Sequence, residues 1–523
     1  MIKLLRERER ERMQFMRIFY FVCLCLFTQS FFLSSNLLAS GFRLTEQSLN
    51  GTALNSAYIA GAYGADSTYY NPANMGLGEY GDKHELEIDA SIIYIPAFEF
   101  NAVSMDKGMN LTCTPTSVLA NAACDQIRGQ YGGKNGAIVD GYAKKTLQPV
   151  PKIFYKTRTY EILGLKTNFG LNFTTPSGLS MDWGGEAGAF LDDVMIMMME
   201  FNPVMSMKFF DDRVAIGGGF RFLYSAGEFG NTLHVPIGYT TIQGTDVPVI
   251  GFIGSEVTAT GTTKAVQTSN AAANGYGYNL ALTIRPFKSS DLLIAVTYRS
   301  NIALEMKGSL SATSYVDMGA MANGTIGMDA DLTLGADLPP IVNIAIAKRF
   351  GKVLAEFVVE KTYYGKARIF EFAYANQKFT NNAGGKICAA WLGSKCLGWI
   401  DTGSYINPDE MLGAADYSAV AYGNGWKDAT AYRLGLTYQH SPKLKIMGSF
   451  AYDKTPAPQG QFGIPDANAY AFGLGARYEL WDGKADVGVA YSLALKDNRK
   501  SFIRSKDGLG QLQLLTFGAK YRF

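Results

Sequence analysis

The chain ends on "LLTFGAKYRF", Leu514–Phe523. Counting back from the end, every second residue belongs to an apolar row: Phe523, Tyr521, Ala519, Phe517 and Leu515. The residues between them are Arg522, Lys520, Gly518 and Thr516. Because successive side chains of a strand point to opposite faces, this alternation predicts a terminal strand with one apolar face and one polar face.

The composition restricts the class of protein. Of the 523 residues, 18% are charged, which is below the roughly 25% of soluble domains. Lys and Arg number 48 against 46 Asp and Glu, so no basic excess exists to neutralise nucleic-acid phosphates. After the N-terminal region, no apolar run approaches the roughly 20 residues of a transmembrane helix. A membrane-embedded form of this chain would therefore use strands.

The terminal pattern recurs along the chain. It is found in "GYGYNLALTIR" (275–285), "YAFGLGARYEL" (470–480) and "ADVGVAYSLALK" (485–496). Such runs exceed the roughly 5–6 residues of an ordinary soluble strand. They match the roughly 9–11 residues with which a tilted strand crosses a bilayer.

The connections between these runs alternate in length. Short polar turns are expected at 157–159, 211–213, 288–291, 349–352, 441–443 and 481–484. Long irregular stretches are expected near 101–146, 177–197, 229–273, 308–330, 374–427, 456–466 and 499–509. Thirteen connections imply fourteen strands, and short turns on one side with long loops on the other are typical of an outer-membrane barrel. The predicted fold is an all-β, 14-stranded antiparallel transmembrane β-barrel, which fits better than a β-propeller because the loop lengths are uneven.

Barrel closure explains the last strand. An open strand edge in lipid would leave backbone groups unpaired, so the final strand must pair with the first. We expect its odd-numbered face to meet lipid and its even-numbered face to meet the lumen.

The N-terminus resembles an export signal. A charged segment up to Arg17 precedes an apolar segment, and the chain turns polar at Ser40, which predicts a signal peptide over 1–39 with cleavage after Ala39. Met13 and Met16 are alternative start sites, and an uncleaved helical anchor is the alternative interpretation.

Four cysteines remain after removal of Cys23 and Cys25 with the signal. In an exported protein, an even number at short spacing suggests two disulfides, Cys113–Cys124 and Cys388–Cys396. Free thiols are the alternative. No metal site is expected, because neither pair has CxxC spacing and the chain has three histidines.

Residues 40–83 precede the first strand and do not alternate, which predicts a compact plug, or hatch, before a barrel over 84–523. "GFRLTEQS" (41–48) and "YYNPANMG" (69–76) resemble the hatch of the FadL/TodX family of outer-membrane fatty-acid and hydrocarbon transporters. Further similarity lies in "NFGL" (168–171), "TYRS" (297–300), "KDATAYRLGLTY" (427–438) and "DKTPAPQGQFGIPDANAYAFGLG" (453–475).

This resemblance implies a monomeric barrel in the outer membrane of a Gram-negative bacterium, with no catalytic residues and no cofactor. It implies that Phe42 lines an inner ligand pocket and that Asn71, Pro72 and Ala73 form a hatch turn, which contacts ligand or only joins hatch to wall. It also implies lateral release through a kink in the third strand, where Gly170 would permit a bend. Phe523 resembles the terminal aromatic residue that barrel-assembly machinery recognises.

Two further groups follow from the resemblance to transporters of hydrophobic compounds. The long loop at 229–273 is apolar, so Val235, Ile237, Val249 and Phe252 are candidates for an external groove; self-packing or strand extension are the alternatives. Lys366 and Arg368 lie near the family's basic position on the ninth strand and are candidates to bind a carboxylate.

The substrate is open at this stage. On the fifth strand, Ser225 and Ala226 replace the family's other basic residue, with Glu228 nearby. Long-chain fatty acids are the expected substrate, and neutral aromatic or aliphatic hydrocarbons are the alternative. A general porin would lack the hatch, and an enzyme is disfavoured because His84, His234 and His440 neighbour no nucleophile motif. A surface adhesin stays a further alternative.

Overall fold

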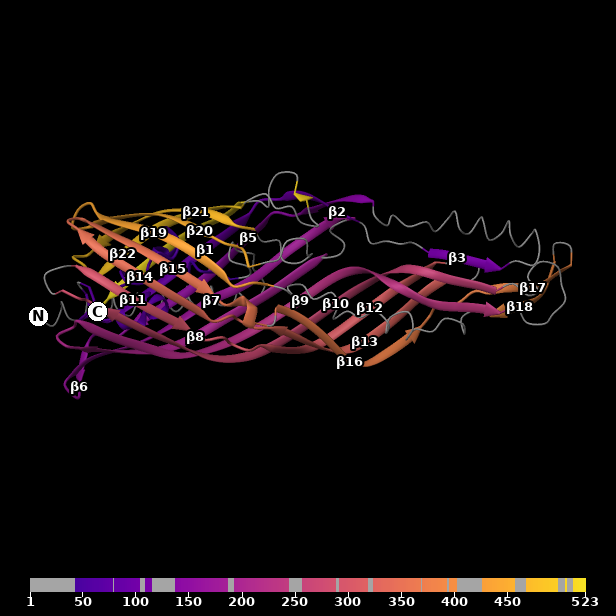
Figure 1. Ribbon diagram of the computed structural model, residues 1–523, viewed down its shortest axis with the longest axis horizontal. Helices are drawn as coiled ribbons and strands as arrows, with labels where there is room; N and C mark the ends of the chain where they lie inside the picture. Colours follow the sequence, from indigo (N-terminus) through magenta and orange to yellow (C-terminus); the bar gives the residue numbers. More distant parts are fainter. Residues whose placement is uncertain are drawn as a thin grey trace, which may run out of the picture.

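The computed structural model describes residues 43–523, except 79, 104–108, 115–136, 187–191, 244–255, 288–290, 318–322, 368, 393–394, 402–425, 457–466, 497–503 and 506–510. The molecule is long and narrow (Figure 1). The C-terminus and β6 (Tyr160–Ile162) lie at one end, and β17 (Lys386–Leu392) and β18 (Lys395–Asp401) lie at the other.

Within these ranges, fourteen strands pair in a closed antiparallel ring, which confirms the predicted fold class and strand number. In ring order they are β1 (Glu85–Ile95), β5 (Thr146–Lys156), β7 (Leu165–Gly185), β8 (Asp193–Phe209), β9 (Val214–Gln243), β10 (Glu256–Ile284), β11 (Leu292–Arg299), β14 (Ile341–Phe350), β15 (Val353–Thr362), β19 (Ala429–Gln439), β20 (Leu444–Asp453), β21 (Ala469–Leu480), β22 (Ala485–Lys496) and β24 (Gln511–Arg522).

The ring closes between its first and last strands. β1 pairs with β24 from Glu85 opposite Arg522 to Tyr94 opposite Gln513. On β24 the even-numbered residues are buried and Phe517 is exposed, as the alternation predicted. Beyond the ladder, the His84 ring stacks on the Phe523 ring at a centroid distance of 5.3 Å. Partial burial, helped by the nearby cations of Arg158 and Lys156, lowers the pKa of His84, so this ring is neutral at neutral pH.

The short turns lie where the sequence predicted them at 211–213, 349–352, 441–443 and 481–484. After β5, however, the chain forms a small hairpin in which β6 pairs with the start of β7. Because outer-membrane barrels place their short turns toward the periplasm, this end of the ring is the periplasmic end.

Where the long stretches are described, they are mostly strands, contrary to the prediction; 457–466 and most of 499–509 lie outside the described residues. β7, β9 and β10 have 21, 30 and 29 residues, so they continue well past the roughly 9–11 residues needed to cross a bilayer. β4 (Ile138–Ala143) pairs with the extension of β7, and β3 (Met109–Thr114) and β12 (Glu305–Asp317) pair with that of β10. Beyond β4 the sheet continues through β2 (Phe98–Val103) to β23 (Arg504–Ser505), and beyond β12 through β13 (Asn323–Ala336) to β16 (Ile369–Asn381). Pairing between strands satisfies the backbone N–H and C=O groups of these extensions. It does not require an apolar residue at every second position, which is the pattern that indicates a membrane-crossing strand.

The segment from Arg43 to Gly78 lies inside the ring. It contains short helical turns: α2 (Leu49–Ala53), α3 (Ser67–Tyr70) and η1 (Pro72–Asn74). Most of its residues are buried, and its hydrogen bonds reach wall strands on every side of the ring, including β1, β7, β10, β15, β19 and β21. We call residues 43–78 the hatch segment. No helix in the described part of the chain is long and apolar enough to cross a membrane.

Candidate functional site

The inward-facing side chains change character along β1 and β24, the two strands that close the ring. On β1 the inward row begins with Glu85, Glu87 and Asp89 and ends with Ile93 and Ile95. On β24 the inward row changes from Lys520 near the periplasmic end to Leu514 and Leu512 farther out. The lumen therefore has an ionic zone around the hatch segment and an apolar zone beyond it.

In the ionic zone, carboxylates of the wall accept hydrogen bonds from the hatch backbone. The Glu356 carboxylate on β15 accepts from the N–H groups of Ile59 (2.6 Å), Ala60 (2.6 Å) and Gly61 (3.0 Å). Asp89 on β1 accepts from the N–H of Leu49 at 2.6 Å. Charge-assisted bonds of this kind are about twice as strong as neutral ones, so the wall holds the hatch segment at its main chain.

Cations of the wall hold the hatch carbonyl groups in the same way. Lys152 Nζ donates to the Glu46 carbonyl oxygen at 2.7 Å, and Arg433 Nη1 donates to the Asn55 carbonyl oxygen at 3.0 Å. Just beyond the hatch segment, Lys156 Nζ donates to the Lys83 carbonyl oxygen at 2.8 Å. These contacts use backbone atoms, so they depend on the path of the hatch segment rather than on its side chains.

The remaining buried charges form ion clusters. Glu200 on β8 accepts from Arg221 at 2.7 Å and also contacts Arg299, whose guanidinium lies 4.3 Å from the centre of the Tyr69 ring. Across the lumen, Glu360 and Asp453 share Arg433. Every described buried cation of the lumen has a carboxylate or carbonyl partner: Arg43, Lys152, Lys156, Lys208, Arg221, Arg299, Arg433, Arg477, Lys520 and Arg522.

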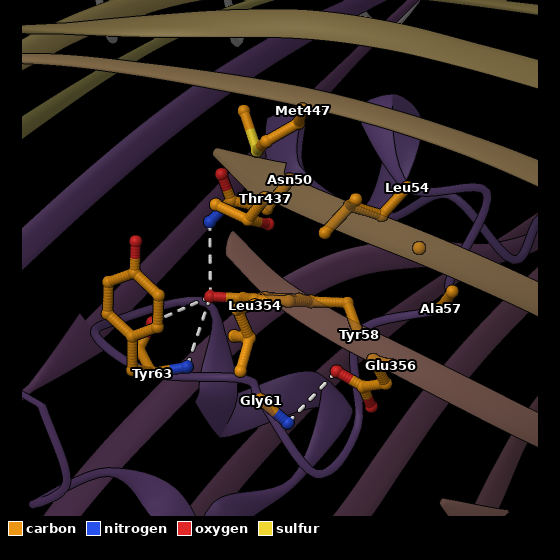
Figure 2. A pocket seen from close by; sticks show the side chains of 11 residues that line it. Asn50, Leu54, Ala57, Tyr58, Gly61, Tyr63, Leu354, Glu356, Thr437 and Met447 are labelled. Atoms are coloured by element: carbon orange, nitrogen blue, oxygen red, sulfur yellow. Dashed lines mark hydrogen bonds between the residues drawn. The ribbon is translucent and has the colours of Figure 1, made fainter. Parts of the chain in front are cut away.

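A small pocket lies between the hatch segment and strands β15, β19 and β20 (Figure 2). Leu54, Ala57, Leu354 and Met447 supply its apolar wall. The Tyr58 hydroxyl, Asn50 and Glu356 supply its polar groups (Figure 2). It therefore lies within the ionic zone, toward the periplasmic turns.

The apolar zone occupies the outer part of the lumen and continues into the strand extensions. Its buried residues include the following from β1, β2, β7, β8, β9, β12 and β13: Ile93, Ile95, Phe98, Phe100, Met181, Trp183, Val194, Ile196, Met198, Leu223, Met306, Leu310, Ile326, Met328, Leu332 and Leu334. Leu44 of the hatch segment belongs to the same cluster. The hatch segment thus reaches the apolar zone only at its first residues.

The wall is interrupted where the two zones meet. β5 pairs with β7 only from Lys156 opposite Gly170 to Ile153 opposite Phe173. The β7–β8 register then shifts between Thr174 and Ser177, a stretch that contains Pro176. Proline lacks the N–H that a ladder needs, which explains a break at this position. Among the described residues, β7 is paired on its β5 side again only near Trp183, by β4.

The first residues of the hatch segment lie along this interruption, which we call the wall gap. Arg43 forms a β-bridge with Ser177, and Leu44 N donates to the Pro176 carbonyl oxygen at 3.0 Å. The Gln47 side chain donates to the Thr175 carbonyl oxygen at 2.7 Å and accepts from its N–H at 3.1 Å. Residues 43–47 therefore act as a short substitute strand on the free edge of β7.

Arg43 also ties this substitute strand to the far side of the lumen. Its Nη1 atom donates to Thr362 Oγ1 at 2.7 Å and to Glu360 Oε1 at 3.2 Å, both on β15. Burial of the unpaired guanidinium would be costly, so this ion pair fixes the position of the segment.

Comparison with protein families matches residues 30–520 to the family described as outer membrane protein transport protein (OMPP1/FadL/TodX). The chain belongs to this family. Its members are outer-membrane proteins, and the closed ring agrees with that location. A comparison with curated proteins gives no match.

Solved structures share the fold of this OMPP1/FadL/TodX-family protein. A Pseudomonas aeruginosa FadL homologue has 14% identity and a TM-score of 0.59, covering 92% of this chain and 99% of that one. The Pseudomonas putida toluene transporter TodX has 11% identity and a TM-score of 0.59, with the same coverage. The Ralstonia pickettii toluene transporter TbuX has 14% identity and a TM-score of 0.53, covering 92% of this chain and 100% of that one.

The predicted hatch turn of this family protein lies in the ionic zone, away from the apolar zone. Asn71 Nδ2 donates to Thr283 Oγ1 on β10 at 2.9 Å and to the Ile59 carbonyl oxygen at 2.8 Å. Pro72 and Ala73 are buried against Gly217 of β9, where an added Cβ would lie 2.4 Å from Ala73 N. These contacts favour the joining of hatch to wall over direct ligand contact. Phe42 lies outside the described residues.

The wall gap does not lie at Gly170, contrary to the prediction. Gly170 pairs in regular register with Lys156 and Val204, and the break begins four residues later. Gly170 instead gives room to the hatch segment, because an added Cβ would lie 2.6 Å from Thr68 Cγ2 and 2.7 Å from Met75 Sδ.

The candidate ligand residues farther out are only partly described. Lys366 does not lie on the ninth strand, β15, but in the turn η3 (Tyr364–Lys366) that follows it, and Arg368 lies outside the described residues. Val235 and Ile237 belong to β9 rather than to an irregular loop, because β9 extends to Gln243. Val249 and Phe252 also lie outside the described residues.

The cysteine pairs stay a prediction. Cys113 belongs to β3, and Cys124 lies outside the described residues. Cys388 and Cys396 lie on the two strands of one hairpin, where Cys388 is opposite Trp399 and Cys396 is opposite Trp391. The two are therefore on paired strands but not directly opposite each other.

Sequence reasoning missed the ion clusters and residues 43–47. A signal for the first was present in "ELEIDAS" (85–91), whose acidic residues recur at every second position. A signal for the gap was present in "TTPSG" (174–178), because a proline inside a long strand pattern marks a break.

Proposed function

We propose that this protein carries apolar compounds through the outer membrane, by binding them in the apolar zone and releasing them sideways through the wall gap. One observation carries the proposal: the lumen lining turns apolar at the level where the wall opens. Glu200 of β8 lies opposite Thr174, and Met198, the next inward residue on β8, lies opposite Ser177 across the break.

The energetics of burial favour this route for an apolar compound. Each CH₂ group removed from water contributes about 0.8 kcal/mol, so a compound of eight carbons gains roughly 6 kcal/mol in the apolar zone. The ionic zone below offers no comparable gain, because its charged groups already have partners. The wall gap opens toward lipid, so sideways release would avoid both water and the ionic zone.

The partners of the lumen cations favour neutral compounds as the substrate. A fatty-acid carboxylate needs a cation, and the described buried cations are bound to carboxylates or backbone carbonyls. Aromatic and aliphatic hydrocarbons need none. Long-chain fatty acids are the second candidate, and they would depend on Lys366 and Arg368.

The processing and assembly of the chain are part of the proposal. We expect cleavage of a signal peptide over 1–39 and folding of residues 40–83 as the hatch of a monomeric barrel. Barrel-assembly machinery would insert it through the terminal strand that ends at Phe523. These expectations rest on the N-terminal sequence pattern and on the family resemblance.

A matched pair of variants on β13 tests the capture step. Leu332 is buried in the apolar zone, and Thr333, the next residue, faces away from it. Leu332→Asp should lower the uptake of radiolabelled toluene by cells that express the protein at least tenfold, because a buried unpaired carboxylate is strongly disfavoured. Thr333→Asp should leave uptake unchanged.

Assembly of both variants is checked by heat-dependent gel mobility and by surface protease protection. Equal uptake by two well-assembled variants would contradict capture in the apolar zone. Efflux of small sugars from reconstituted vesicles gives a second readout, because a general porin would pass them and this protein should not.

A further inference from the structure

Trp183 has a buried indole N–H without an acceptor. Its side chain is 4% exposed, and the Nε1 atom has no hydrogen-bond partner within the described part of the chain. Buried tryptophan N–H groups usually find a partner, and a buried donor without one costs free energy. This donor therefore calls for a partner that none of the described residues supplies.

The surroundings of Trp183 resemble an aromatic binding site. Its ring meets Phe98 edge to face at a centroid distance of 5.8 Å and Phe100 at 5.3 Å, with interplanar angles of 88° and 86°. All three residues belong to the apolar zone, on β2 and β7. Planar aromatic compounds pack well in such edge-to-face arrangements.

The position of Trp183 connects it to the proposed route. It lies opposite Ala143, where β4 resumes the pairing of β7 beyond the wall gap. Met181, the preceding inward residue of β7, belongs to the same cluster. A compound bound beside Trp183 would therefore lie at the outer border of the gap.

We propose that Trp183, with Phe98 and Phe100, forms a subsite for neutral aromatic compounds that carry one oxygen acceptor, such as an aryl ketone, to which the indole N–H donates. This subsite deepens the proposed function and rests on it. A ketone oxygen accepts the hydrogen bond of the indole N–H without bringing charge into the apolar zone. A carboxylate would also accept the bond, but its charge would be buried without a counterion.

Three compounds of nearly equal shape test this subsite: α-methylstyrene, acetophenone and benzoate. They differ in one group, which is C=CH₂, C=O or COO⁻. Dissociation constants are measured by calorimetry on the purified full-length protein in detergent. The quantity compared is the Kd of α-methylstyrene divided by that of acetophenone, in wild type and in Trp183→Phe.

The ratio should fall by about three- to tenfold in Trp183→Phe, the range for one net hydrogen bond. Dividing the two constants within each protein and comparing proteins removes the difference in water solubility of the compounds. Trp399→Phe is the matched control, because Trp399 is 60% exposed on the distant β17–β18 hairpin. The control should leave the ratio unchanged.

The outcomes separate the subsite from the proposed function. An unchanged ratio in Trp183→Phe would overturn the subsite, and benzoate binding tighter than acetophenone would overturn its neutral character. If none of the three compounds binds, capture in the apolar zone itself fails. If Trp183→Phe does not assemble, the NMR resonance of the Trp183 indole N–H in the wild-type protein provides the test. This resonance should shift more with acetophenone than with α-methylstyrene. Equal shifts would overturn the subsite.

Discussion

Removal of the Glu356 carboxylate should loosen one side of the hatch segment. In Glu356→Ala, the N–H groups of Ile59, Ala60 and Gly61 lose the acceptor that they reach at 2.6, 2.6 and 3.0 Å. A buried N–H without an acceptor costs about 1–3 kcal/mol, so three cost roughly 3–9 kcal/mol before relaxation. Water that enters the space left by the side chain offsets a large part.

We expect the free energy of local opening to fall by about 2–4 kcal/mol. That change corresponds to roughly 30- to 1,000-fold faster hydrogen exchange of the three amides. The loop should otherwise stay in place, because Asn74 Nδ2 donates to the Ala60 and Ala62 carbonyl oxygens at 2.9 and 3.1 Å. Glu356→Gln keeps one oxygen acceptor and should show a smaller increase.

Hydrogen exchange with mass spectrometry of the reconstituted protein measures this effect. Glu161→Ala is the control, because Glu161 is exposed on β6 and contacts no part of the hatch segment that is described. The reasoning would be refuted if exchange at residues 59–61 in Glu356→Ala stayed within about threefold of wild type. In that case the wall carboxylates would not hold the hatch segment.

Three further changes have definite expected results. Gly170→Val should lower the thermal midpoint of the barrel by forcing a side chain against Met75, an overpacking cost of about 1–3 kcal/mol. Gly448→Val should not, because an added Cβ there would meet the Gly473 carbonyl oxygen at an ordinary contact distance of 3.8 Å; equal midpoints would contradict this packing. Gln47→Ala should speed both hydrogen exchange at residues 43–47 and uptake of apolar compounds, because it removes the hydrogen bonds to Thr175. Slower uptake would contradict the view that residues 43–47 close the wall gap. Non-reducing peptide mapping should find two disulfides, Cys113–Cys124 and Cys388–Cys396. Free thiols or cross-paired cysteines would disprove this prediction.

The sequence predicted the barrel because period-two alternation is imposed by lipid on one side and water on the other. For the same reason, the strand extensions could not be predicted from period-two alternation. Beyond the membrane no lipid imposes an apolar face, so β9 and β10 continue as strands where the pattern indicated loops. The terminal strand was predicted from Leu514 onward, and the structure begins it three residues earlier, at Gln511.

The site was less predictable, since it depends on pairs that are distant along the chain. Arg43 and Glu360 are 317 residues apart, and no local pattern relates them. Glycine permits a bend, so the sequence pointed to Gly170. The break in strand pairing lies instead at Pro176, because proline has no backbone N–H to donate to the neighbouring strand. The unpartnered N–H of Trp183 is a property of packing alone.

Photolabelling tests the central claim, sideways release at the wall gap, most directly. An alkylbenzene that carries a diazirine is bound to the wild-type protein in lipid vesicles, and its adducts are mapped by mass spectrometry after illumination. Release through the gap predicts adducts on Gln148 and Val150 of β5 and on Thr175 and Ser177 of β7. Adducts confined to the periplasmic pocket, at Leu354 and Met447, with none along the gap, would contradict it and indicate passage through the hatch segment.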